Sequence, residues 1–317
     1  MTGIPYRAPV ALGAIFVFSL AAVGGDDPQV SLSIRKQTPP ARADFRAESD
    51  LVLVPVSVTD ERNHAVTGLG RDAFRVFEDK AEQSIVQFSS EDLPLSVGIV
   101  FDLSGSMTGK LAKSRQAMSE FLRFANPEDE FFLVEFSDRP RLTVPFTSDT
   151  GFIQDRLRIV EPKGTTALLD AVCLAMNTMK KARYSRRALV ILSDGGDNHS
   201  RYSAAEIRDR IRESDVWIYA MGIYEQRPPM ALEVASGKKL LQALADDSGG
   251  RNFSVDSLID LPVVAARISL ELRNQYVLGY RPADPARDGK YHRVEVNVVG
   301  GRDLRVSWRP GYYGMAE

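Results

Sequence analysis

The stretch VGIVFDLSGSMTGK, from Val97 to Lys110, passes from an uninterrupted apolar run into a loop of small polar residues. Such a run is typical of a strand that is buried on both faces of a parallel sheet. Apolar residues then recur at helical spacing between residues 110 and 125. The stretch therefore predicts the first strand, loop and helix of an α/β domain.

Apolar strand segments and helical segments continue to alternate along the chain after this stretch. The strand segments include FFLVEFS (131–137), ALVILSD (188–194) and DVWIYAMGI (215–223). This order predicts a doubly wound, mostly parallel, Rossmann-like sheet with helices on both faces. We assign this α/β domain to residues 94–273.

Both flanks of the α/β domain have the pattern of β structure. LVLVPVSVTD (51–60) alternates as a strand does, and NQYVLGYRP (274–282) and YHRVEVNVV (291–299) are separated by the turn signal Asp288-Gly289. A small sheet needs a packed face to be stable. We therefore predict that residues 50–93 and 274–317 pack together into one composite unit, the β module, with the α/β domain inserted between them.

The N-terminus has the order of a secretory signal peptide. Arg7 precedes an apolar run and then small residues, so we assign residues 1–25 to the signal peptide and residues 26–49, with several prolines, to a linker. The alternative is an uncleaved segment that anchors the chain in a membrane. In both cases we expect an exported protein, located in the periplasm or outside the cell.

The composition narrows the range of functions and of stabilising devices. The hydrophobic and charged fractions, 44% and 26%, are those of a globular protein. A formal charge of -2 gives no electrostatic reason to expect a nucleic-acid partner. Cys173 is the sole cysteine, so the chain forms no internal disulfide.

The spacing of residues in the loop after Asp102 does not match two common kinds of functional loop. A phosphate-binding loop ending in Gly109-Lys110 would need glycine at Ser104 and a hydroxyl residue at Leu111. A nucleophile elbow between Gly105 and Gly109 would need serine where Met107 stands.

A metal site fits the loop better. Hydroxyl and carboxyl side chains follow two predicted strands and precede one helix, and the carboxyl edge of an open α/β sheet is where ligands bind. Oxygen ligands suit Mg²⁺ above all, or Mn²⁺ or Ca²⁺, whereas zinc favours cysteine or histidine. The candidate ligands are Asp102, Ser104, Ser106, Thr166 and Asp194. Thr165 and Asp197 would lie at the rim of the site or contact the ligands without binding the cation.

The segments FDLSGSM (101–107), GTTALLDAV (164–172) and LSDGGDN (192–198) resemble those of the von Willebrand factor type A domain, with its metal-ion-dependent adhesion site. The resemblance covers residues 94 to 272. It implies that Ser104 and Ser106 bind the cation directly, and that Thr166 does so directly or in the ligand-bound state. Asp102 and Asp194 would act largely through water molecules and hydrogen bonds to the serines.

One position departs from the pattern of such domains, which often carry a second glycine where this chain has Thr165. The register of the following ALLDA favours Thr166 over Thr165 as the ligand. The flanks resemble those of a group of bacterial exported proteins with a related type A domain.

The leading functional hypothesis is an exported, non-enzymatic adhesion or interaction module. Its cation would be completed by an acidic side chain of a protein partner, and a membrane would be involved only if the signal segment stays uncleaved. A second hypothesis is a structural subunit of an envelope assembly, in which the metal only stabilises the fold. A third is a metal-assisted hydrolase, for which the sequence offers no evident general base beside the site.

Overall fold

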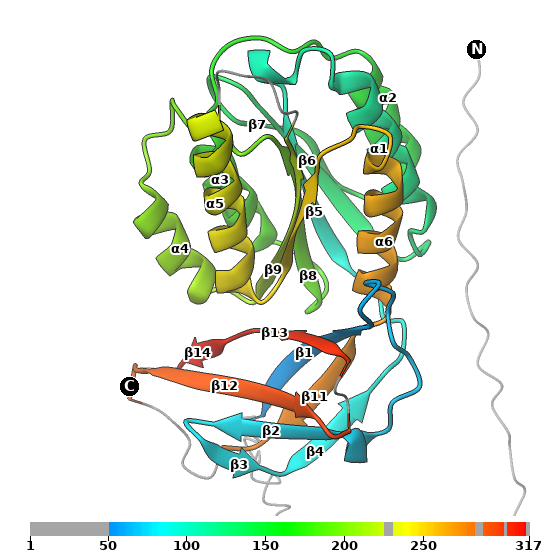
Figure 1. The fold of residues 1–317 in the computed structure, drawn as a ribbon, viewed down its shortest axis with the longest axis vertical. Helices are drawn as coiled ribbons and strands as arrows, with labels where there is room; N and C mark the ends of the chain where they lie inside the picture. The colour runs from blue at the N-terminus through cyan, green and yellow to red at the C-terminus, as the bar shows by residue number, and fades with distance from the viewer. Residues whose placement is uncertain (1–50, 225–230, 283–287, 301–302, 315–317) are drawn as a thin grey trace, which may run out of the picture. The chain divides into compact units, whose positions relative to one another are not determined.

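The computed structural model describes residues 51–224, 231–282, 288–300 and 303–314. These residues form one six-stranded sheet and two four-stranded sheets (Figure 1). The predicted signal peptide and linker, residues 1–25 and 26–49, lie outside the described residues. Within the described ranges, no helix combines the length and the apolar character needed to cross a membrane.

The six-stranded sheet is the centre of the α/β domain. Its strand order is β10-β9-β8-β5-β6-β7, and every neighbouring pair is parallel except β6 and β7. The strands are β5 (Ser96–Asp102), β6 (Glu130–Phe136), β7 (Arg141–Thr147), β8 (Arg187–Ser193), β9 (Val216–Ile223) and β10 (Arg251–Val255). The predicted doubly wound, mostly parallel sheet is confirmed.

Among the described residues, six α-helices pack on this sheet. Figure 1 shows them on its two faces. One apolar core forms against α1, α2 and α6, and a second forms against α3, α4 and α5. The helices are α1 (Leu111–Arg123), α2 (Thr150–Arg158), α3 (Leu168–Met179), α4 (Ala204–Arg212), α5 (Ala231–Ser248) and α6 (Leu261–Arg273). Every residue of β5 is buried, as its continuous apolar run predicts for a strand covered on both faces.

The order of the strands reverses between β5 and β8. From β5 the chain adds β6 and β7 on one side, then returns to place β8, β9 and β10 on the other. Ligands of open α/β sheets bind outside the carboxyl ends of the strands at such a switch point. The loops that follow Asp102 and Ser193 therefore lie where the fold favours a binding site.

The two flanks of the chain pair with each other, which confirms the predicted composite β module. β1 (Val52–Thr59) lies between β11 (Tyr276–Tyr280) and β13 (Arg305–Trp308), with Val54 opposite Leu278. The other strands are β2 (Phe74–Glu78), β3 (Ala81–Gln83), β4 (Ile85–Ser89), β12 (Tyr291–Val298) and β14 (Gly311–Tyr313). The sheet orders are β13-β1-β11-β4 and β14-β12-β2-β3.

Both four-stranded sheets contribute to one apolar core of the β module. Val56 and Tyr276 from the first sheet join Phe74 and Val296 from the second. The indole N–H of Trp308 donates to the carbonyl oxygen of Val294 at 2.8 Å, which ties the two sheets together. Each flank contributes two strands to each sheet, so neither flank completes a sheet alone and the β module needs both.

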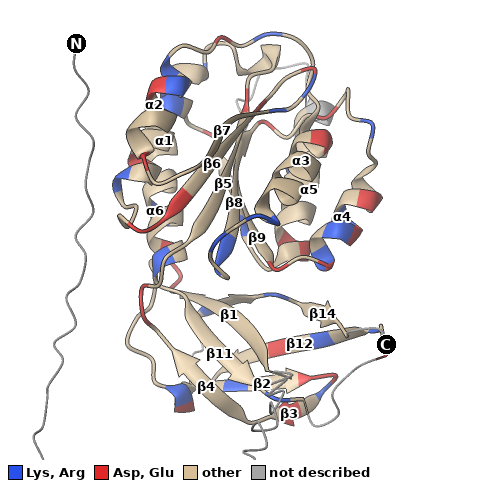
Figure 2. Cartoon of the chain, turned by 180° about the vertical axis from the view of Figure 1, so that it is seen from behind, with Lys and Arg blue, Asp and Glu red and all other residues tan. Residues whose placement is uncertain are grey.

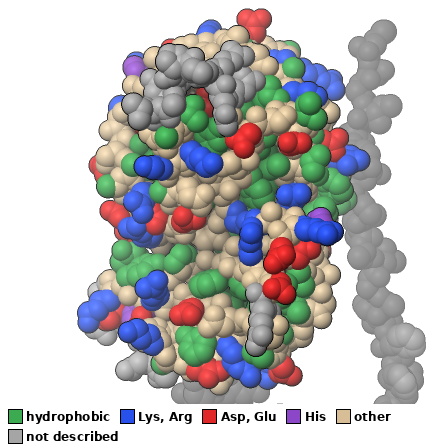
Figure 3. Space-filling model, in the orientation of Figure 1, with side chains coloured by type: hydrophobic (Ala, Val, Ile, Leu, Met, Phe, Trp, Pro, Cys, Tyr) green, Lys and Arg blue, Asp and Glu red, His purple; other side chains and the backbone are tan. Residues whose placement is uncertain are grey.

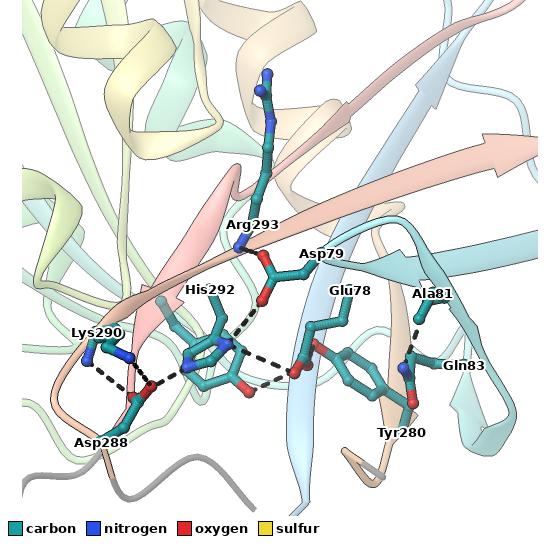
Figure 4. Close-up of polar contacts among 10 residues, drawn as sticks. Glu78, Asp79, Ala81, Gln83, Tyr280, Asp288, Lys290, His292 and Arg293 are labelled. Atoms are coloured by element: carbon teal, nitrogen blue, oxygen red, sulfur yellow. Dashed lines mark hydrogen bonds and ion pairs between the residues drawn. The ribbon is translucent and has the colours of Figure 1, made fainter. Parts of the chain in front are cut away.

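A polar cluster inside the β module joins its N- and C-terminal parts (Figure 4). The buried Glu78 carboxylate accepts hydrogen bonds from the hydroxyls of Tyr280 at 2.5 Å and Tyr312 at 3.1 Å. We call this group the Glu78 cluster; its members are Glu78, Asp79, Tyr280, Asp288, His292 and Tyr312. Because Glu78 is more than 200 positions from its tyrosine partners, the cluster holds the two flanks in register.

The His292 imidazole lies between carboxylates in the same cluster. Nδ1 is 2.9 Å from Oδ2 of Asp79, and Nε2 is 3.2 Å from Oδ1 of Asp288 (Figure 4). Burial lowers the pKa of His292, but the hydrogen bonds to Asp288 and Asp79 outweigh it, so the net shift is above the usual 6.5. The cluster therefore favours the imidazolium.

The β module contacts the α/β domain through arginine side chains. Arg251, at the start of β10, donates to Asn63 Oδ1 at 2.6 Å, and Arg305 of β13 donates to the same oxygen at 3.1 Å. Arg309 forms an ion pair with Asp215, just before β9. These contacts lie at the edge of the sheet where the parallel strands begin, which is opposite to the loops at their carboxyl ends.

Charged residues lie mainly on the helices and loops, and the middle of the six-stranded sheet is largely uncharged (Figure 2). Lysine and arginine side chains alternate with acidic side chains over the face in Figure 3. Such mixing is typical of a solvated surface.

Candidate metal site

Three loops meet at the carboxyl edge of the sheet, between β5 and β8. The backbone N–H of Gly105, after β5, donates to the carbonyl oxygen of Gly164, before α3, at 3.0 Å. The N–H of Asn198, after β8, donates to the carbonyl oxygen of Thr166 at 3.0 Å. All three segments that carry the predicted ligands are therefore linked by backbone hydrogen bonds.

Asp102 ends β5 as a completely buried carboxylate. Its Oδ1 accepts the backbone N–H of Ser104 at 2.8 Å, and its Oδ2 accepts the Ser193 hydroxyl at 2.6 Å. Burial raises the pKa of Asp102 to about 6 against the hydrogen bonds from Ser104 and Ser193, and the nearby Asp194 adds to the rise. The charge of Asp102 thus costs free energy that its neutral partners do not fully offset.

Ser104 and Ser106 present their hydroxyls side by side. Their Oγ atoms are 3.0 Å apart, because a short 3₁₀ turn (Gly105–Met107) folds the loop back on itself. Met107, the last residue of this turn, is fully buried, and its side chain anchors the turn in the apolar core. Ser104 is buried and Ser106 is exposed, so the pair reaches from the sheet edge to the surface.

Thr165 and Thr166 have different surroundings. The N–H and the hydroxyl of Thr165 both donate to Asp138 Oδ1 at 2.6 Å. Thr166 is almost fully buried, and its N–H donates to Asn198 Oδ1 at 2.9 Å. Thr165 is therefore held against the loop after β6, and Thr166 against the loop after β8.

The turn before these threonines requires glycine. Gly164 has a φ of +81°, and a Cβ there would lie 2.5 Å from Asp138 Oδ1. Asp138 follows β6 and was not singled out from the sequence. A lone acidic residue after a strand is common, so only its contact with Thr165 reveals its role in shaping the site.

Asp194, after β8, is paired with a lysine. Its Oδ2 lies 3.1 Å from Nζ of Lys110, and both side chains are largely buried, with 15% and 11% of their surface exposed. The sequence predicts Lys110 only as the entry to the first helix. Its ammonium instead lies within the candidate site.

Asp197 stands behind the loop edge. Burial raises its pKa, while hydrogen bonds from Ser200 and from the backbone of Leu168 lower it. One of its oxygens, Oδ1, is buried and has no hydrogen-bond partner among the described residues. Asp197 is thus partly buried, and its hydrogen-bond partners are Ser200 and the start of α3.

The donor chemistry fits a small, hard cation. The candidate ligands offer only oxygen atoms, from hydroxyls and carboxylates, as Mg²⁺ prefers. The hydrogen-bond partners of the buried Asp102 carboxylate among the described residues are neutral groups. A divalent cation close to these residues would offset this charge.

A second group of possible ligands lies in the β module. One ligand atom each from Glu78, Asp79 and His292 lies within 4.8 Å of the others. Both nitrogens of His292 already face carboxylates, however, so the group forms an internal ion-pair cluster (Figure 4). No local sequence pattern points to these residues, because 213 positions separate Asp79 from His292.

Comparisons with known proteins agree with this arrangement of loops. Residues 97–196 match the family model described as von Willebrand factor type A domain. Inter-alpha-trypsin inhibitor heavy chain H4 from Bos taurus is 26% identical over 139 residues, which are 40% of this chain and 15% of that protein. An uncharacterized protein of Borreliella burgdorferi is 24% identical over 181 residues, or 50% of this chain and 53% of that one. The chain thus spans only part of the length of these relatives.

A solved structure supports the same fold. The von Willebrand factor type A protein from Catenulispora acidiphila superposes with a TM-score of 0.50 at 13% identity, covering 86% of this chain and 75% of that chain. The family match and the six-stranded sheet lead to one conclusion. The chain contains a von Willebrand factor type A domain, which the family model matches at residues 97–196.

Proposed function

We propose that the protein is an exported protein-binding module whose affinity depends on a divalent cation. Ser104, Ser106 and Thr166 would hold Mg²⁺, or Mn²⁺ or Ca²⁺, and an acidic side chain of a protein partner would complete its coordination. The family match at residues 97–196 supports an interaction module. Export rests on the predicted signal peptide at residues 1–25.

The observation that carries this proposal is the meeting of three loops around a buried acid. Asp102 is fully buried and accepts hydrogen bonds on both oxygens, so it is held in one orientation. The adjacent hydroxyls of Ser104 and Ser106 are 3.0 Å apart, which suits two ligands of one ion. Such an arrangement is costly without a cation, because a buried carboxylate is left without a countercharge.

A bound divalent cation supplies a positive charge that a partner carboxylate can neutralise. The chain itself fixes the geometry. Asp102 orients Ser104 through its backbone N–H, and Asn198 fixes the backbone of Thr166. Ser106, which is exposed, lies where an incoming side chain would approach.

A pocket of about 590 Å³ opens near this edge. Asp138 and Asp170 line it together with Arg139 and Arg201, and Arg201 forms an ion pair with Asp170 at 3.1 Å. Because acidic and basic side chains balance in this lining, the proposed acidic partner rests on the charge of the cation.

We propose binding rather than catalysis for this site. Both oxygens of Asp102 are engaged by protein donors, so Asp102 is poorly placed to take a proton from a substrate. The alternative role, a structural subunit in which the metal stabilises only the fold, makes a different prediction. Metal would then raise the melting temperature without changing partner capture.

The test compares wild type with Ser106→Ala and with the control Ser119→Ala, an exposed serine on α1. Each immobilised full chain is exposed to envelope and secreted fractions in Mg²⁺ or in EDTA. We expect wild type and Ser119→Ala to capture a partner only in Mg²⁺. In Mg²⁺, Ser106→Ala should capture at least about tenfold less partner than wild type, as expected when a charge-assisted contact is lost. Capture that persists in EDTA and in Ser106→Ala would contradict the proposal.

A further inference from the structure

Lys110 directs its side chain into the candidate site. Gly109, with a φ of +83°, turns the chain just before it, and α1 begins at Leu111. The backbone of Lys110 is held at both ends, since its N–H donates to Met107 and its carbonyl accepts the N–H of Ser114. This position leaves Lys110 only 9% exposed, whereas a lysine that merely opened a helix would extend into solvent.

The Lys110 ammonium partly neutralises the acids of the site. Its Nζ is 3.1 Å from Asp194 Oδ2, and Asp194 is close enough to Asp102 for their charges to repel. The two carboxylates carry two negative charges, and Lys110 offsets one. A divalent cation would then leave the group with one net positive charge, whereas without Lys110 the group would be neutral.

We propose that the Lys110 ammonium competes with the divalent cation for the carboxylates of the site. Lys110 thereby lowers the affinity of the site for the cation, and it strengthens the attraction of the occupied site to a partner carboxylate. This inference rests on the proposed function, because it concerns the same site. Like charges a few ångströms apart repel strongly where water is largely excluded. Lys110 therefore sets the divalent concentration at which the site becomes able to bind a partner.

The test is direct binding of Mn²⁺ to the full chain, measured by isothermal titration calorimetry. The variants are Lys110→Met, the charge-preserving Lys110→Arg and the control Lys113→Met, whose Nζ contacts only Gln116 among the described residues. We expect Lys110→Met to bind Mn²⁺ at least about tenfold more tightly than wild type. Lys110→Arg and Lys113→Met should stay within about threefold of wild type.

Failure of this inference and failure of the proposed function give different results. Equal or weaker Mn²⁺ affinity in Lys110→Met, with a clear loss in Ser106→Ala, would overturn the role of Lys110 alone. Absence of Mn²⁺ binding in wild type and in every variant would overturn the proposed function, and this inference with it. If Lys110→Met does not fold, as judged by circular dichroism, Lys110→Gln makes the same comparison.

Discussion

Removing the Tyr280 hydroxyl tests how strongly the Glu78 cluster holds the two flanks of the β module together. Tyr280 is fully buried, and its hydroxyl donates to Glu78 Oε2 at 2.5 Å. Burial and then the adjacent Glu78 raise the pKa of Tyr280, so the hydroxyl keeps its proton and stays a donor. The change Tyr280→Phe removes this donor and leaves the ring in place.

The expected loss follows from the chemistry of the bond. A hydrogen bond to a charged group contributes about 1.5–3 kcal/mol to stability. Glu78 keeps a second donor, Tyr312, at 3.1 Å, so the carboxylate is not left unpaired. We therefore expect Tyr280→Phe to lower the free energy of unfolding by about 2 kcal/mol, which corresponds to roughly 4–8 °C in melting temperature.

Urea unfolding followed by circular dichroism, together with calorimetry, measures this loss. The control is Tyr313→Phe, because Tyr313 is exposed, and it should change stability by less than about 0.5 kcal/mol. In a Glu78→Gln background the cost of Tyr280→Phe should fall below about 1 kcal/mol, because the acceptor is then neutral. If Tyr280→Phe proves as stable as Tyr313→Phe, the hydrogen bond adds nothing and the reasoning is refuted.

Two further predictions concern the pH dependence of stability and the packing of the central strand. The pKa of His292 is raised on folding, so its contribution is fully present below its unfolded pKa and is lost as pH rises through the folded value. The melting temperature should therefore fall as the pH rises above 6.5, the ordinary pKa of histidine, and His292→Gln should flatten that slope; an unchanged slope would exclude His292 as its source. Gly98→Ala should cost about 1–3 kcal/mol in urea unfolding, because its Cβ would lie 2.2 Å from Phe132 Cζ and 2.5 Å from Leu189 Cδ2. Wild-type stability of that variant would mean that the two faces of β5 are less tightly packed than described.

Much of the fold follows from local sequence patterns. The continuous apolar run of β5 predicts a strand covered on both faces, and it is buried along its whole length. The alternating flanks predict strands too few to be stable alone, and those strands pair across the chain. The register of β1 with β11 is not predictable in this way, because it depends on packing between residues more than 200 positions apart. The segment DSLIDLPVVAARISLELRN (256–274) predicts a helix over its whole length, but α6 begins only at Leu261, with a proline in its first turn.

The candidate site is less completely encoded in local sequence. The spacing of Asp102, Ser104 and Ser106 points to their convergence, because alternate residues after a strand share one side. The contact of Lys110 with Asp194 is not visible from sequence, since 84 positions separate them and the direction of the lysine depends on the turn at Gly109. Long-range side-chain pairs of this kind are set by tertiary packing, which no local pattern records.

The candidate site and the β module lie at opposite ends of β5. This separation decides whether a substitution in the β module changes cation binding at the site. The chain crosses between module and domain near Leu93 and Leu272, whose carbonyl oxygens accept Arg186 Nη1 at 2.7 Å and Nη2 at 2.5 Å. Both crossings lie beside the start of β5, and its 7 residues place Asp102 about 20 Å away. Effects at sites so far apart are usually additive. Tyr280→Phe should therefore lower stability without changing Mn²⁺ affinity, whereas a change in that affinity would mean that Arg186 and β5 transmit strain between the module and the site.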